Sequence, residues 1–188
     1  MRPIILTSAL ACLALAACDN ADKGPKTLDQ AKAEAQQMER PEPGQYSQTT
    51  KFTKFDVPGA PPAMAEQIKG MMQDKGETTT YCLSKEDSEK GFEEMFKKVG
   101  EGECKYERFD ASASTIDAVL VCETGPGGSA RLAMSGTVSK TGSNVKVDVQ
   151  QKNDKSPMGN ANIAMELETK RIGDCQAGGD KSPAQKPG

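Results

Sequence analysis

The chain has 188 residues, of which 36% are hydrophobic and 4% aromatic, and it carries a formal net charge of −3 with no histidine. This length accommodates one domain of ordinary size once a removable start and a polar tail are set aside. The slightly acidic balance argues against a nucleic-acid-binding protein, and the polar composition argues against a multi-pass membrane protein.

Residues 1–17 have the features of a secretory signal peptide. After one positive charge comes the apolar stretch 4–17, which is too short to span a bilayer as a helix. It ends in Leu15-Ala16-Ala17-Cys18, which resembles the bacterial lipobox. The sequence therefore predicts that Cys18 becomes the lipid-modified first residue of the mature protein. The alternative is a plain signal peptide with Cys18 as a bystander. Asp19 resembles the inner-membrane sorting signal of enteric lipoproteins and slightly favours that membrane.

Residues 18–40 are interpreted as the lipidated N-terminus and a tether. Leu28, Ala31, Ala35 and Met38 recur at helical spacing behind a possible Thr27 cap. Such a short and mostly polar helix has little apolar area to bury and is marginal alone. The tether would hold the domain off the membrane, and a docking helix for a partner is the alternative.

The folded domain is predicted for residues 41–175, with a disordered tail over residues 176–188. The domain is predicted to be α+β, with a curved antiparallel sheet of about six strands, two short helices packed on it and two disulfides. Clusters of β-forming residues predict the strands at 45–57, 104–109, 115–123, 130–135, 145–150 and 163–168, beside a β-rich run at 77–83.

Two helices are predicted within this domain. The first follows Pro61-Pro62, and we expect its apolar face to cover one side of the sheet; that face comprises Met64, Ile68, Met71 and Met72. The second starts at Ser84, which with Asp87 resembles a capping box. It is expected to bury Phe92, Met95, Phe96 and Val99.

The four cysteines of the domain indicate a disulfide framework, because export places them in an oxidising compartment. Four cysteines allow three pairings. Folding the strands at 104–109 and 115–123 about Ala113 places Cys104 opposite Cys122, which leaves Cys82 to pair with Cys175. A zinc site built from all four is the functional alternative, but no C-x-x-C pair supports it.

No catalytic or metal-binding constellation is recognisable. The absence of histidine removes the commonest general base and every Ser-His or Cys-His nucleophile. Ser84-Lys85 and Ser139-Lys140 are adjacent pairs whose side chains diverge. We therefore expect no enzyme, no catalytic residue, no metal and no cofactor. The alternative is an envelope-remodelling hydrolase of Ser-Lys or carboxylate type.

Several ordered motifs together resemble one family. They are Pro43-Gly44-Gln45-Tyr46, the Pro58-Gly59 turn with its Met-rich helix, Cys82-Leu83-Ser84-Lys85-Glu86-Asp87, Cys104, Cys122 and Gly173-Asp174-Cys175. This pattern resembles the proteobacterial envelope proteins of domain-of-unknown-function family 3617. Tyr46 stands where Trp is common in that family, and Lys85 where Pro is common. The family has no established activity, so the resemblance implies an exported domain and transfers no catalytic residue.

The sequence thus predicts a non-enzymatic periplasmic domain, attached to the membrane through lipid on Cys18, that binds a hydrophobic small molecule or an envelope partner and no nucleic acid. A purely structural role is a further alternative. A cavity lined by Met64, Met71, Leu132, Val147 and Met165 would favour ligand binding. An exposed apolar patch on a packed core would favour a protein partner.

Overall fold

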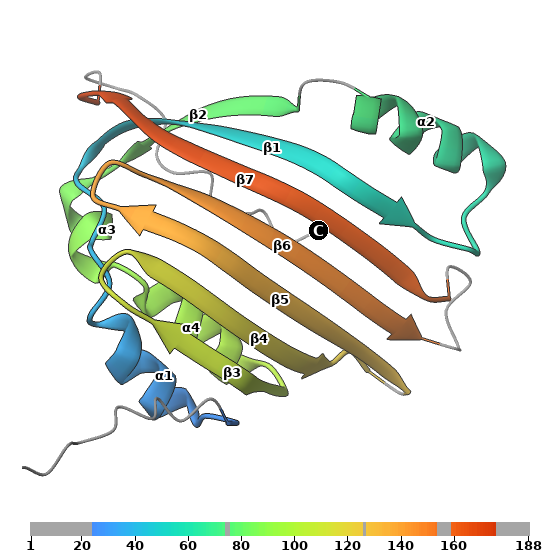
Figure 1. The fold of residues 1–188 in the computed structure, drawn as a ribbon, viewed down its shortest axis with the longest axis horizontal. Coiled ribbons are helices and arrows are strands. Elements are labelled where there is room, and N and C mark those ends of the chain that lie inside the picture. The colour runs from blue at the N-terminus through green and yellow to red at the C-terminus, as the bar shows by residue number, and fades with distance from the viewer. Residues whose placement is uncertain (1–23, 74–75, 126, 154–158, 176–188) are drawn as a thin grey trace, which may run out of the picture.

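The computed structural model describes residues 24–73, 76–125, 127–153 and 159–175 (Figure 1). The strands are β1 (Gly44–Asp56), β2 (Glu77–Leu83), β3 (Cys104–Ala111), β4 (Thr115–Glu123), β5 (Gly128–Ser139), β6 (Gly142–Asn153) and β7 (Ala161–Gly173). The helices are α1 (Leu28–Ala35), α2 (Pro62–Gln73), α3 (Lys85–Lys90) and α4 (Glu93–Glu101). All seven strands form one open antiparallel sheet in the order β2-β1-β7-β6-β5-β4-β3.

The prediction of an α+β domain built on an antiparallel sheet is confirmed. The sheet has seven strands where about six were expected, because the β-rich run at 77–83 pairs with β1 as edge strand β2. The helix predicted to start at Ser84 is divided into α3 and α4. Gly91 ends α3 with a φ of +57°, a left-handed conformation that glycine adopts without steric cost.

Helix α2 does not cover the sheet as expected but lies along its edge (Figure 1). Its main contact is with β1, and Met64 is 40% exposed. The reason is the distance between the end of β1 and the start of β2. The pairing of β2 with β1 reaches only to Thr50, so the connection between the two strands must run back along residues 51–56 of β1. Six strand residues span about 20 Å, and the 12 residues of α2 span about 18 Å.

Helix α1 belongs to the hydrophobic core, although it lies in the stretch interpreted as a tether. Ala31, Ala35 and Met38 are 0%, 4% and 4% exposed. They pack in one cluster with Phe96 of α4 and with side chains of β3 and β4, which are Tyr106, Phe109, Ile116, Ala118 and Leu120. The alanines let α1 approach β3 closely, so the core lies between this end of the sheet and the two helices.

Polar contacts hold α1 in place. The Thr27 hydroxyl accepts from the Gln30 amide at 3.3 Å while the Gln30 side chain accepts from the Thr27 amide at 2.9 Å, which completes a capping box. The ammonium of Lys26 donates to the Phe109 carbonyl at 2.6 Å and forms ion pairs with Glu34 and Asp110. These contacts tie the start of α1 to β3.

Both predicted disulfides are present. Cys104 and Cys122 face each other in the β3–β4 register, as the fold-back about Ala113 predicts. Cys82, near the end of β2, is bonded to Cys175, just after β7. The second bond connects both strands that flank β1, because β1 pairs with β2 on one side and β7 on the other.

Candidate ligand-binding surfaces

The two faces of the sheet differ in chemistry. On one face, ion pairs join different strands: Arg108 of β3 with Asp117 of β4 at 2.5 Å, Arg131 of β5 with Glu107 of β3 at 3.2 Å across the intervening β4, and Lys146 of β6 with Glu166 of β7 at 3.7 Å. The other face carries the core cluster under α1 and α4. A sheet with one charged and one apolar face is typical of antiparallel packing, in which the apolar face is the one that is covered.

The apolar face continues beyond the helices over β5, β6, β7 and β1. We call this part the open apolar face; it comprises Phe52, Phe55, Leu132, Val145, Val147, Val149, Ile163, Met165 and Leu167. Directly paired residues share a face, and the register pairs Val147 with Met165 and Met165 with Phe52. Val147 is 8% exposed and the others are half-buried. Among the described residues, the main contacts of the helices with the sheet are with β3 and β1.

The structure brings three of the five residues proposed to line a ligand cavity to one face. Leu132, Val147 and Met165 share the open apolar face. Met64 lies apart from them on the exposed surface of α2 at the sheet edge. The side chain of Met71 lies outside the part of the chain that the structure describes. Val147 is buried, and Leu132 and Met165 are half-buried on that face.

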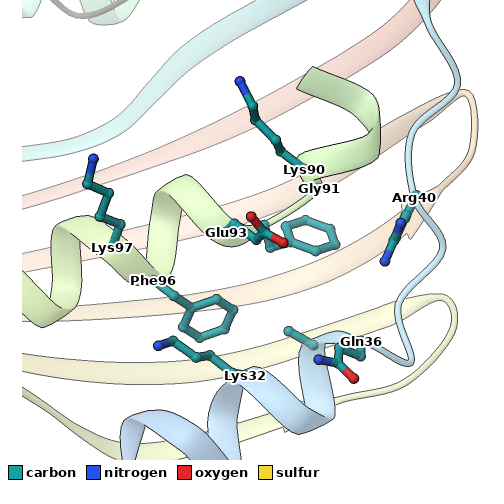
Figure 2. A pocket seen from close by; sticks show the side chains of 10 residues that line it. Lys32, Gln36, Arg40, Lys90, Gly91, Glu93, Phe96 and Lys97 are labelled. Atoms are coloured by element: carbon teal, nitrogen blue, oxygen red, sulfur yellow. The ribbon is translucent and has the colours of Figure 1, made fainter. Parts of the chain in front are cut away.

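A separate pocket of about 510 Å³ lies between α1 and the α3–α4 segment (Figure 2). We call it the α1–α4 pocket. It is lined by Lys32, Ala35, Gln36, Arg40, Lys90, Gly91, Phe92, Glu93, Phe96 and Lys97. Its floor is apolar, because Ala35 and Phe96 are buried in the core cluster and Phe92 packs against it. Lys32, Arg40 and Lys97 are exposed; Lys32 lies beside the Phe96 ring, Arg40 lies on the segment after α1, and Lys97 projects from α4 away from that ring.

The cations of this pocket differ in their partners. Lys90 lies 2.9 Å from Glu86 and 3.6 Å from Asp87, and the hydrogen bond and charge of Glu86 raise the pKa of Lys90. Arg40 donates one N–H to the Glu89 carbonyl at 3.2 Å. Among the described residues, neither Lys32 nor Lys97 has a carboxylate oxygen within 4.0 Å.

Sequence reasoning missed this pocket. Its two walls lie fifty or more positions apart in the chain, and the wall from Lys32 to Arg40 falls in the stretch interpreted as a tether. The signal that could have indicated it was the Thr27 capping box followed by alanines at helical spacing, since alanines on one helix face allow close packing against a partner.

The serines of the two Ser-Lys pairs take part in local backbone structure. The Ser84 hydroxyl accepts from the Asp87 amide at 3.0 Å and donates to the Asp87 carboxylate at 2.7 Å, which caps α3. The Ser139 hydroxyl donates to the Gly142 carbonyl at 3.0 Å in the β5–β6 turn. Within the described ranges, no three Cys, Asp or Glu side chains gather as metal ligands would.

The fold and its disulfides define the class of protein: a disulfide-linked domain on an open antiparallel sheet, of the kind found in oxidising, extracytoplasmic compartments. No helix in the described part of the chain is both long and apolar enough to cross a bilayer. The chain belongs to the family described as Protein of unknown function (DUF3617), whose model matches residues 41–175. No curated protein and no solved structure matches the chain.

The family match confirms the resemblance found in the sequence and indicates no function. Cys18 and the proposed signal peptide lie outside the described residues, as does the tail from residue 176, so the lipid anchor stays a prediction. The match also begins after α1, so the structure adds a packed helix in front of the family region.

Proposed function

We propose that this chain is a non-enzymatic binding domain of the cell envelope, anchored through lipid on Cys18, that holds a hydrophobic small molecule on its open apolar face. The observation that carries this proposal is the continuation of apolar side chains in paired rows across β6, β7 and β1, beyond the helices that cover β3. Covering such a surface is favourable because it removes apolar area from water.

The shape of the open apolar face favours an elongated ligand. One row runs from Met134 through Val147 and Met165 to Phe52. Neighbouring strands lie about 4.8 Å apart, so a row across four strands is about 14 Å long. Rows that are two residues apart along a strand are separated by about 6.8 Å. An extended hydrocarbon chain fits along such a track and gains about 0.8 kcal/mol for each methylene that it buries.

Two observations support a binding role over a hydrolytic one. Ser84 and Ser139 already use their hydroxyls in a helix cap and a turn. The side chain of Lys26 is 7% exposed, and its ammonium contacts two carboxylates and a backbone carbonyl. In a Ser-Lys enzyme the lysine would contact the catalytic serine instead. A partner protein with an apolar surface is the second candidate occupant, favoured by the extent of the apolar rows over four strands.

The test compares two substitutions at neighbouring positions of β7. Met165→Glu places a charge on the open apolar face, whereas Ala164→Glu places the same charge on the opposite face beside Asp148. The unlipidated chain from Asp19 to Gly188 keeps every described residue and is purified without detergent. Native mass spectrometry before and after denaturation detects a carried ligand, and titration with cis-parinaric acid, a fluorescent fatty acid, measures affinity.

We expect Met165→Glu to weaken fatty-acid binding by about tenfold or more, because a buried charge without a partner costs more than 1.4 kcal/mol. Ala164→Glu should bind as the natural chain does. Absence of both a carried ligand and fatty-acid binding would refute the small-molecule proposal. An envelope protein cross-linked through the open apolar face in cells would then support the second candidate.

A further inference from the structure

We infer that the α1–α4 pocket binds a phosphate group carried on an apolar body. This site is separate from the open apolar face, because its walls come from α1, the segment that follows it, and α3–α4. The inference rests on the charge of the rim, the character of the floor and the size of the pocket.

The rim gathers positive charge on a chain whose net charge is −3. Lys32, Arg40 and Lys97 all line the pocket, and no carboxylate oxygen of a described residue lies within 4.0 Å of their side-chain nitrogens. Glu93 is the carboxylate in the lining, and it is exposed. Cations therefore remain in excess at the mouth, which favours an anion of more than one charge, such as a phosphate monoester.

Arg40 is oriented for this task. Among the described residues, the Arg40 guanidinium donates one hydrogen bond, to the Glu89 carbonyl at 3.2 Å, which places it next to α3. A guanidinium has five N–H donors in a planar fork, so most of them stay available to a ligand. This geometry matches two oxygens of a phosphate group at once.

The floor accounts for the apolar body. Phe96 is 3% exposed and Ala35 4% exposed, and Phe92 lies beside them. The volume of about 510 Å³ falls within the range of small-molecule sites. A ligand with its apolar part on this floor would place its anionic group at the cationic rim.

The position of the pocket allows two sources of the phosphate. Leu28, the first residue of α1, is ten positions after Cys18, so a lipid on Cys18 would hold the pocket within at most about 36 Å of a membrane surface. A phospholipid headgroup and a soluble phosphate ester share the required chemistry. The experiment has one arm for each.

The first arm titrates the unlipidated chain 19–188 with phenyl phosphate and with inorganic phosphate by calorimetry. The second arm measures sedimentation with phosphatidylcholine vesicles that contain phosphatidylglycerol or lack it. The test variant is Lys32→Gln with Lys97→Gln. The control is Lys51→Gln with Lys54→Gln, which changes the net charge equally on β1, five strands away from β3 in the sheet.

We expect phenyl phosphate to bind about tenfold more tightly than inorganic phosphate, since the ring adds buried apolar area. The test variant should weaken binding about tenfold, and the control should not. Binding in the vesicle arm alone identifies a lipid headgroup, and binding in the first arm alone identifies a soluble ester. Absence of binding in both arms, or equal weakening in both variants, would overturn the inference. Met165→Glu should leave this binding unchanged, which separates the outcome from that of the fatty-acid test.

Discussion

Replacing Met38 tests whether the segment before residue 41 is part of the folded core. Met38 is 4% exposed and packs in the cluster that joins α1, α4, β3 and β4. The chain on either side of it is held by backbone hydrogen bonds: the Met38 amide donates to the Ala35 carbonyl at 3.1 Å, and the Glu39 amide donates to the Ala113 carbonyl at 2.9 Å. Such a side chain cannot leave the core without moving the backbone.

The expected cost follows from the atoms removed. Met38→Ala deletes three side-chain heavy atoms, each comparable to a buried methylene that contributes about 0.8 kcal/mol, or about 2.4 kcal/mol in all. The cavity left behind adds to this loss, because the surroundings relax only in part. We therefore expect the free energy of unfolding to fall by about 2.5–3 kcal/mol. Met64→Ala is the matched control: Met64 is 40% exposed, and its replacement should change stability by less than about 0.5 kcal/mol.

Urea unfolding of the oxidised chain measures both effects. With an m-value of about 2 kcal/mol/M, Met38→Ala should lower the midpoint by more than about 1 M, with an unchanged slope. Met64→Ala should leave the midpoint in place. Equal midpoints for the two variants would show that residues 26–40 are a tether that contributes nothing to the core, and would refute the packing described for α1.

The remaining predictions concern the contacts that hold the two ends of the domain. Burial lowers the pKa of Lys26, but the hydrogen bond and charge of Glu34, with the charge of Asp110, outweigh it and raise the pKa above its ordinary value of 10.5. Lys26→Met should therefore lower the free energy of unfolding by about 2 kcal/mol below pH 10.5. This difference in stability between the variant and the natural chain should shrink as the pH rises through the raised pKa, because deprotonation of Lys26 removes the same contribution from the natural chain. A difference that stays constant in urea unfolding up to about pH 11.5 would contradict the assigned ion pairs. The disulfides enclose 93 and 18 positions, for which loop-closure entropy gives about 4.7 and about 3.2 kcal/mol. Replacing Cys82 and Cys175 by Ala should thus lower the melting temperature more than replacing Cys104 and Cys122. The reverse order would mean that the core packing of Cys104–Cys122, the bond with the shorter loop, outweighs the difference in loop-closure entropy.

The sheet and the disulfides could be predicted because their signals are local. Val145, Val147 and Val149 alternate with charged and polar residues, and this alternation is typical of a half-buried β-strand. The Cys104–Cys122 bond follows from the equal distance of both residues from a turn. Once Cys104 and Cys122 are paired, Cys82 and Cys175 are the two cysteines of the domain that remain for the second disulfide.

The positions of the helices could not be predicted, because they depend on contacts between distant parts of the chain. Helix α1 has a weak apolar stripe, and its alanines become core residues only where Phe96 and Phe109 lie close to them. Helix α2 has the stronger stripe of methionines, yet Met64 is exposed. Its place is set by the register of β2 on β1, which leaves the helix along the edge. Apolar spacing predicts that a helix forms, and the sheet topology decides what it covers.

The candidate sites likewise divide into a part that local sequence patterns predict and a part that depends on contacts between distant parts of the chain. Leu132, Val147 and Met165 share one face because they lie on neighbouring strands whose alternation is visible in the sequence. The α1–α4 pocket takes one wall from residues 32–40, which precede the family match, and the other from residues 90–97, which lie inside it. A member of the family without a counterpart of α1 would keep the sheet and both disulfides but lose Lys32 and Arg40. The binding proposed for this pocket is therefore not implied by membership in the family, whereas the binding proposed for the open apolar face depends only on strands inside the matched region.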